Sequence, residues 1–225
     1  MHHKKNSVRL IAGWLLFGLS VSLPAMAHVA VRELDNLSKA DAAIVYLVLG
    51  FKHILPLGFD HILFVLSLFL LSPKLKPIIW QSTAFTVAHS VTLCLAAYNV
   101  INPPTRIIEP LIALSILYVA LENIYSPRLK ASRIGIVFLF GLVHGLGFAG
   151  ALAEMGLPKN AYFTSLIMFN VGVELGQLTV ILLAYFLLAK WFAGKPYYRS
   201  RVVIPLSIII VLIAGFWTIQ RIFFV

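Results

Sequence analysis

The segment 42–71 reads AAIVYLVLGFKHILPLGFDHILFVLSLFLL and is apolar except for a few side chains near its middle. An α-helix needs about 20 such residues to cross a bilayer, so this segment is long enough to span one. Strands of a membrane barrel would instead alternate polar and apolar residues at every second position, which this segment does not do. It therefore predicts a helical membrane protein.

The composition of the whole chain agrees with this prediction. Of its 225 residues, 60% are hydrophobic and 12% are charged, against about 25% charged in an average soluble domain. This excludes a disordered chain and a soluble enzyme of ordinary composition, and a single cysteine, Cys94, excludes a disulfide scaffold. The net charge of +10 does not indicate nucleic-acid binding, because the basic residues are scattered between apolar runs. The expected partner is the lipid bilayer.

Residues 1–27 have the three parts of a secretory signal peptide. A basic start precedes a short apolar stretch, and Ala25 and Ala27 form an A-x-A cleavage pattern. Cleavage would leave a single domain, 28–225, beginning at His28, whereas an uncleaved signal anchor is the alternative. A terminal amine beside an imidazole can chelate Cu(II) or Ni(II), but the sequence shows no second ligand nearby, and His28 is assigned no role.

Six apolar runs follow, at 42–71, 80–100, 107–125, 134–153, 161–189 and 202–224. They predict an all-α bundle of six transmembrane helices. The first and fifth runs exceed the length of one bilayer crossing, so they must tilt, break or extend beyond the lipid.

The charges between the runs predict the orientation. Basic residues collect after the first, third and fifth runs, namely Lys74, Lys76, Arg128, Lys130, Arg133, Lys190, Lys195, Arg199 and Arg201. These connections are expected in the cytoplasm. Both mature termini would then face the periplasm or exterior of a bacterial inner membrane.

Ionisable side chains inside the spans are energetically expensive and usually face a partner or a cavity. Five of them are expected to meet near the bilayer midplane, Asp60, His61, His89, His144 and Glu174. Imidazole with carboxylate suits Ni, Co, Zn, Cu or Fe as a divalent ion. The alternative is that each histidine separately bonds a neighbouring helix.

The spacing within the first run sharpens this expectation. His53 and Asp60 are separated by about 10 Å along a straight helix, so one ion cannot touch both. Either the helix carries two successive binding positions for the ion, with His53 as the outer station, or it breaks. Pro56 and Gly58 favour a break, a device that forms ion sites in transporters.

Glycines are expected to pack the fourth and fifth spans closely, and polar residues of the spans are expected to support the metal site. Two G-x-x-x-G pairs predict close helix packing, Gly141 with Gly145 and Gly172 with Gly176. Three further polar residues are expected to support the metal site, Ser90, Asn170 and Gln177. A Gly-x-x-His pattern at Gly50 and again at Gly141, three spans apart, is compatible with an inverted three-plus-three repeat.

Four motifs in this order resemble the HupE/UreJ family, over about residues 45 to 180. They are GFDH at 58–61, FTVAHS at 85–90, FGLVHGLGFA at 140–149 and NVGVELGQ at 170–177. Members are small polytopic bacterial membrane proteins, many of them regarded as nickel or cobalt permeases that serve hydrogenase or urease. The resemblance implies a permease for a divalent metal, nickel or cobalt before zinc or copper. It implies metallocentre assembly proteins or further copies of the chain as partners.

The chain departs from the family pattern at two places. Better-known members carry H-P-x-x-G-x-D-H in the first span, whereas in this chain the leading histidine is displaced to His53 and Pro56 does not follow it. A later motif, F-H-G-x-A-H-G-x-E, has Phe140 in place of its first histidine and Gly147 in place of its glutamate. Glu174 is the hypothesised replacement carboxylate.

Two other functions stay open beside the permease. Three histidines with an aspartate could hold zinc in an intramembrane hydrolase, with Glu174 as the base. An accessory protein would bind a metal or a partner and transport nothing. The chain has no P-loop, so ATP-driven transport by this chain alone is not expected, whereas coupling to protons is open.

Overall fold

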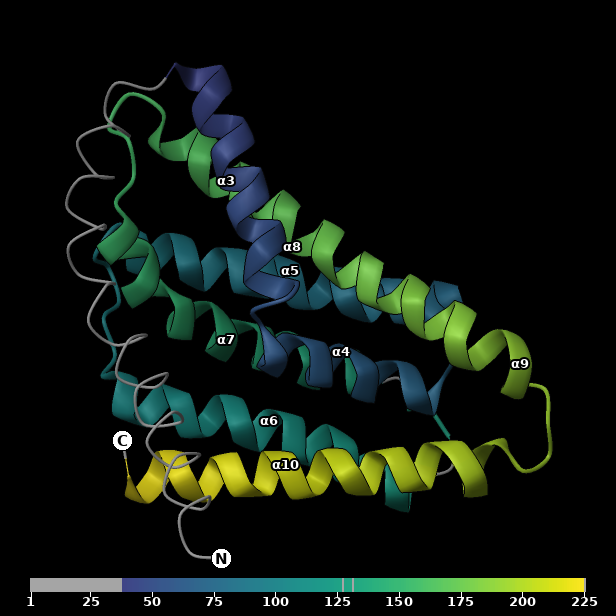
Figure 1. The fold of residues 1–225 in the computed structure, drawn as a ribbon. Coiled ribbons are helices and arrows are strands. Elements are labelled where there is room, and N and C mark those ends of the chain that lie inside the picture. Colours follow the sequence, from purple (N-terminus) through teal and green to yellow (C-terminus); the bar gives the residue numbers. More distant parts are fainter. Residues whose placement is uncertain (1–37, 127, 131, 225) are drawn as a thin grey trace, which may run out of the picture.

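The structure is a computed structural model that describes residues 38–126, 128–130 and 132–224. The predicted signal peptide and His28 lie outside the described residues. Within the described part all regular structure is helical, as expected (Figure 1). Five helices are long and apolar enough to cross a membrane, and a sixth span is added when the bent pair described below is counted as one.

The helices follow one another along the chain with short connections. They are α3 (Lys39–Ile54), α4 (Phe59–Leu71), α5 (Leu75–Ala97), α6 (Thr105–Tyr125), α7 (Arg133–Met155), α8 (Tyr162–Ala184), η1 (Tyr185–Ala189), α9 (Lys190–Phe192), η2 (Arg199–Val203) and α10 (Ile204–Phe223). The segments η1 and η2 are single π-helical turns that continue directly into α9 and α10.

The first apolar run is broken in its middle. Helix α3 ends at Ile54, α4 begins at Phe59, and the two axes meet at 67°. Pro56 has no N–H to donate and its ring obstructs a continuous helix. Gly58 lies so close to the carbonyl of His53 that a side chain has no room there. The length of this run required it to tilt, to break or to extend beyond the lipid, and the structure has the break.

The fifth apolar run stays continuous instead. Helices α8, η1 and α9 form one rod of 31 residues, Tyr162–Phe192, which is about 46 Å long. A bilayer core is about 30 Å thick, so this rod tilts or extends past the lipid. In Figure 1 it crosses the molecule obliquely, with α3 alongside it.

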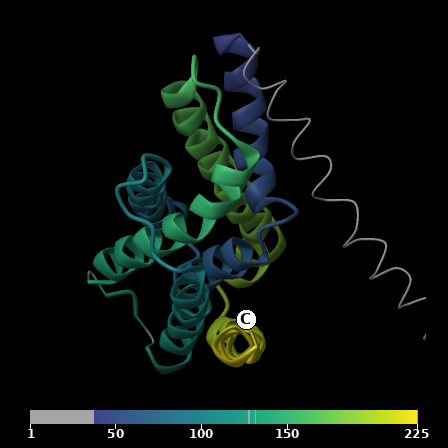
Figure 2. The same ribbon diagram turned by 90° about the vertical axis from the view of Figure 1, so that its left-hand side faces the viewer.

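Three helix pairs build the bundle: α3 with α8, α5 with α7, and α6 with α10 (Figures 1 and 2). The first two pairs meet at glycines. A side chain on Gly172 would strike the backbone of Leu47, and one on Gly145 would strike the carbonyl of His89. Gly141 faces Phe85 in the same way, and Gly176 faces the side chain of Ile54. These approaches hold α8 and α7 at backbone distance from the helices that carry histidines.

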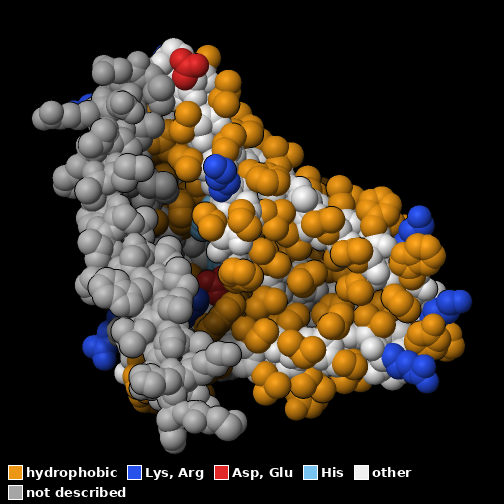
Figure 3. Space-filling model, viewed as in Figure 1, with side chains coloured by type: hydrophobic (Ala, Val, Ile, Leu, Met, Phe, Trp, Pro, Cys, Tyr) orange, Lys and Arg blue, Asp and Glu red, His pale blue; other side chains and the backbone are white. Residues whose placement is uncertain are grey.

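The outside of the molecule is apolar over a wide band. Figure 3 shows hydrophobic side chains covering the visible face of the helices, with basic side chains gathered at the end near α9 and the turn into η2. Lys190, Lys195 and Arg201 are exposed in that turn. Such a band with a basic end is what a bilayer requires of a spanning bundle.

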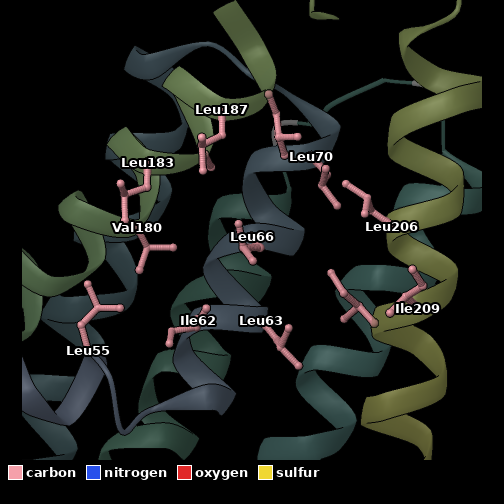
Figure 4. A pocket seen from close by; sticks show the side chains of 13 residues that line it. Leu55, Ile62, Leu63, Leu66, Leu70, Val180, Leu183, Leu187, Leu206 and Ile209 are labelled. Atoms are coloured by element: carbon pink, nitrogen blue, oxygen red, sulfur yellow. The ribbon is translucent and has the colours of Figure 1, made fainter. Parts of the chain in front are cut away.

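An apolar cavity of about 460 Å³ lies between α4, the α8–η1 rod and α10 (Figure 4). All thirteen residues that line it are aliphatic, among them Leu66, Val180, Leu187 and Ile209. No lining side chain can ligate an ion, so this cavity suits hydrocarbon and is not the site described next.

Candidate metal centre

Three histidines from three helices meet inside the bundle. His53 lies in the last turn of α3, His61 in the first turn of α4 and His89 within α5. Each offers a ring nitrogen, and these nitrogens all lie within 4.8 Å of one another. His61 is 6% exposed and His89 is fully buried, whereas His53 is half-buried. We call these residues the three-histidine site.

The break between α3 and α4 creates this site. The rings of His53 and His61 have their centroids 4.7 Å apart, although eight residues on a straight helix would separate them by about 12 Å along the axis. The expected separate outer station at His53 is therefore not what the structure has, because the bend brings His53 to the same group of nitrogens.

The orientation of the His89 ring is determined by an asparagine on α8. Asn170 donates its Nδ2–H to the carbonyl of Leu166 at 2.8 Å, which turns its Oδ1 toward Nδ1 of His89 at 3.3 Å. An amide oxygen only accepts, so Nδ1 of His89 carries the ring proton and Nε2 keeps its lone pair. Metal-binding histidines usually have such a partner on the second ring nitrogen.

His144 lies beside the three-histidine site but is not one of its members. Its ring centroid is 5.0 Å from that of His61, and it is 1% exposed. Ser115 donates its hydroxyl proton to the carbonyl of Ile112, so at 2.9 Å it accepts from Nε2–H of His144. The lone pair of His144 is then on Nδ1. This fourth imidazole is thus a neighbour within reach of a side-chain rearrangement.

Several ring nitrogens have no partner in the described part of the chain. Nε2 of His53, His61 and His89 and Nδ1 of His144 are all buried without a hydrogen bond. Leaving a polar atom buried and unpaired costs about 1–3 kcal/mol each, so such atoms are rare in native proteins. Three of them belong to the histidines that could hold a metal ion, a ligand that accepts lone pairs.

The donor set fits a divalent transition metal ion. Imidazole nitrogens suit Zn, Ni, Co and Cu, whereas Mg and Ca require oxygen ligands. Nitrogens at about 2.1 Å from a tetrahedral ion lie about 3.4 Å apart. The observed separations of up to 4.8 Å therefore require the rings to draw together by about 1.4 Å around an ion.

Phenylalanine rings enclose the site. Phe148 lies 3.9 Å from His53 between ring centroids and stacks on Phe169 at 4.8 Å. Phe85 contacts His61 and His144 edge-on, at 5.8 and 4.9 Å. These apolar rings lower the polarity around the imidazoles, which strengthens electrostatic interactions within the site.

Asp60 does not join the histidines. Its two carboxylate oxygens accept hydrogen bonds of 3.0 and 2.9 Å from Nη2 of Arg221, near the end of α10. Arg221 also lies 3.4 Å from the carboxylate of Glu109. The expectation for Asp60 fails because α10 returns along α6 and delivers an arginine to the start of α4, a pairing across 161 residues that sequence spacing does not reveal.

Glu174 and the supporting residues are divided between two places. The carboxylate of Glu174 accepts a hydrogen bond of 2.8 Å from Thr83 and lies outside the three-histidine group. Gln177 accepts from Ser82 at 2.5 Å, and Ser90 donates to the carbonyl of Thr86 on its own helix. Asn170 alone of the three supporting residues contacts a histidine of the site.

Sequence reasoning missed a buried ionic network at the other end of the bundle. Arg133 is 1% exposed and lies 3.1 Å from Glu122. Its Nη2 also donates to Oδ1 of Asn123 at 3.2 Å, and Asn123 donates to the carbonyl of Ser67 at 2.7 Å. By position in the sequence Arg133 belongs with the basic loop residues. The adjacent polar pair Glu122–Asn123 is the signal in the sequence that a partner lies nearby.

These features define a class, a polytopic helical membrane protein with a buried cluster of imidazoles at a broken helix. The family model for the HupE / UreJ protein matches residues 28–221, so the chain belongs to the HupE/UreJ family, which is associated with nickel or cobalt uptake or with metallocentre accessory roles. No curated protein and no solved structure matched the chain.

Proposed function

We propose that this protein carries a divalent transition metal ion across the membrane, with nickel and cobalt as the first substrates to test. The observation that carries the proposal is the convergence of His53, His61 and His89, whose buried Nε2 atoms have no partner in the described part of the chain. Membership of the HupE/UreJ family supports metal handling as the function.

Each histidine has a distinct part in this proposal. His53 is half-buried and is the first to exchange water for imidazole on the incoming ion. His61 and His89 complete the dehydration, and Asn170 holds the Nε2 atom of His89 toward the ion. His144, with its own free Nδ1, accepts the ion as it moves deeper into the bundle.

The orientation of the chain is part of the same proposal. The basic turn between α8 and α10 would lie in the cytoplasm, following the positive-inside rule. The Asp60–Arg221–Glu109 group lies at the ends of α4, α6 and α10 that are far from this turn. It would then face the periplasm of a bacterial inner membrane.

An intramembrane zinc hydrolase is the competing use of three imidazoles with an open fourth position. That chemistry needs a general base within hydrogen-bond reach of the metal-bound water. Glu174, the base expected in such a hydrolase, is engaged with Thr83, and Asp60, the aspartate expected to help hold the zinc, is engaged with Arg221. The carrier is therefore the better supported function.

The test combines binding with transport. Purified protein in nanodiscs is titrated with CoCl₂ and NiCl₂, and the Co(II) absorption spectrum reports nitrogen ligation. The same protein in liposomes is assayed for uptake of radioactive ⁶³Ni or ⁵⁷Co. The wild-type chain is expected to bind and take up metal, and His61→Ala and His89→Ala are expected to lose about tenfold or more in affinity.

A matched control is Thr179→Val. The Thr179 hydroxyl bonds the carbonyl of Leu175 on its own helix and does not face the histidines. Binding without uptake would replace the carrier with an accessory role. One tightly held zinc ion together with cleavage of lipid esters or amides would favour the hydrolase.

A further inference from the structure

Glu174 differs from the other carboxylates of the bundle. Asp60 and Glu109 pair with Arg221, and Glu122 pairs with Arg133. Asp41 lies at the exposed start of α3, where Ser38 donates a hydrogen bond to it. Among the carboxylates whose side chains the structure describes, Glu174 is the one inside a span without a cationic partner.

The surroundings of Glu174 are polar but uncharged. One carboxylate oxygen accepts from Thr83, while the other, Oε2, is buried without a partner among the described residues. One turn further along α8, Gln177 is fully buried, and its Nε2 also has no partner there. Helices α3, α4 and α5 pack against α8. Their titratable groups make no hydrogen bond or ion pair with Glu174 in the described structure: Lys39, Asp41, Tyr46, Lys52, His53, Asp60, His61, Lys76, His89 and Cys94.

A line of polar side chains connects this place with the three-histidine site. On α8, Asn170 bonds His89, and Glu174 follows one turn later on the same face, about 6 Å further along the axis. On α5, Thr86 and Ser82 both donate to Gln177, and Thr83 donates to Glu174. The line runs from the histidines toward the basic end of α8.

We infer that Glu174 binds the proton whose movement drives metal transport, an inference that rests on the proposed function. A carboxylate in a membrane interior requires a neutralising cation. A divalent hard cation needs about six oxygen ligands, which one carboxylate among hydroxyls and an amide does not supply. A single proton on a carboxylate oxygen neutralises the single negative charge of Glu174. That proton leaves to water at the basic end when the metal site changes its occupancy, and a proton from the opposite side replaces it.

Glu174→Gln tests this directly, because glutamine keeps the shape and the bond to Thr83 but cannot release a proton. The matched control is Glu109→Gln, the same change at a carboxylate that has Arg221 as partner. Purified protein in nanodiscs is examined by infrared difference spectroscopy on addition of CoCl₂. A change in a carboxylic-acid carbonyl band is expected in the wild type and in Glu109→Gln, and its absence is expected in Glu174→Gln.

Proteoliposomes provide the second measurement. With Glu174→Gln, Co²⁺ uptake driven by a pH gradient should fall by about tenfold or more, while Co²⁺ exchange at equal pH and the affinity for Co²⁺ stay as in the wild type. A Glu174→Gln variant that keeps gradient-driven uptake, or that retains the infrared band, overturns the inference. A tenfold loss of Co²⁺ affinity does so too, because Glu174 would then be a metal ligand. Absence of uptake in the wild type, with the infrared change intact, defeats the carrier proposal and leaves the proton site standing.

Discussion

The carbonyl oxygen of His53 lies against Gly58 so closely that a Cβ atom at Gly58 would overlap it. This contact lies inside the turn that joins α3 to α4 and is part of what holds His53 beside His61. The glycine at this position is therefore needed for a backbone approach and not for a ligand.

Gly58→Ala should weaken metal binding without removing any ligand. The added methyl group forces the His53 backbone away, and a displaced imidazole costs about tenfold or more in affinity. Titration with CoCl₂ in nanodiscs measures this. Gly135→Ala serves as control, since a Cβ atom there meets nothing within 4 Å. Equal loss in both variants would contradict the assignment.

Asn170→Leu should act on the metal site through His89. Without the amide oxygen, the proton of His89 is free to move to Nε2, and the lone pair no longer faces the other histidines. A loss of about 10–100-fold in Co²⁺ affinity is expected. Asn170→Asp keeps an acceptor at the same place and should restore most of it. If leucine and aspartate behave alike, Asn170 has no orienting role.

Arg133→Met should destabilise the fold, because it leaves the carboxylate of Glu122 without its partner inside the bundle. Breaking a buried pair from one side costs about 3–5 kcal/mol. The free energy of unfolding in mixed detergent micelles reports this loss. The double variant Arg133→Met with Glu122→Leu removes both charges and should recover much of the stability. A double variant no better than the single one would mean that the charges are not coupled.

Gly172→Val should separate α3 from α8. Its side chain would strike the backbone of Leu47 and Phe51, so the helices must move apart. Overpacking of this kind costs about 1–3 kcal/mol or more. Thermal unfolding in detergent checks the loss, with Gly215→Val, whose Cβ atom meets open space, as the reference. Unchanged stability in Gly172→Val would show that the contact is not required.

Much of the fold could be predicted from the sequence, because long apolar runs identify the helical spans. The break at Pro56 and Gly58 followed from local backbone chemistry. The length of the fifth run left a break and a continuous rod equally open. The structure has a continuous rod of 31 residues, in keeping with the absence of proline from that run.

The site was harder to predict. Depth within a span brought His61 and His89 into one expected group, but depth does not determine the direction in which a side chain points. Asp60 and Glu174 lie at depths compatible with the histidines, yet Arg221 and Thr83 hold their carboxylates elsewhere. Such partners come from distant parts of the chain, across 161 and 91 residues, and depend on how the helices pack. The signal peptide, the orientation and the inverted repeat stay predictions.

The bend of 67° between α3 and α4 makes the size of the three-histidine site depend on an angle between two rigid rods. His53 is near the end of one rod and His61 near the start of the other, so rotation about the joint changes the gap between their nitrogens directly. Helix α3 has 16 residues and is about 24 Å long. When it rotates about the bend, its far end therefore moves much further than His53 does. A sideways displacement of a few ångströms at the far end of α3 would change the distance between the ring nitrogens of His53 and His61 by a fraction of that amount, and with it the fit of the site to an ion.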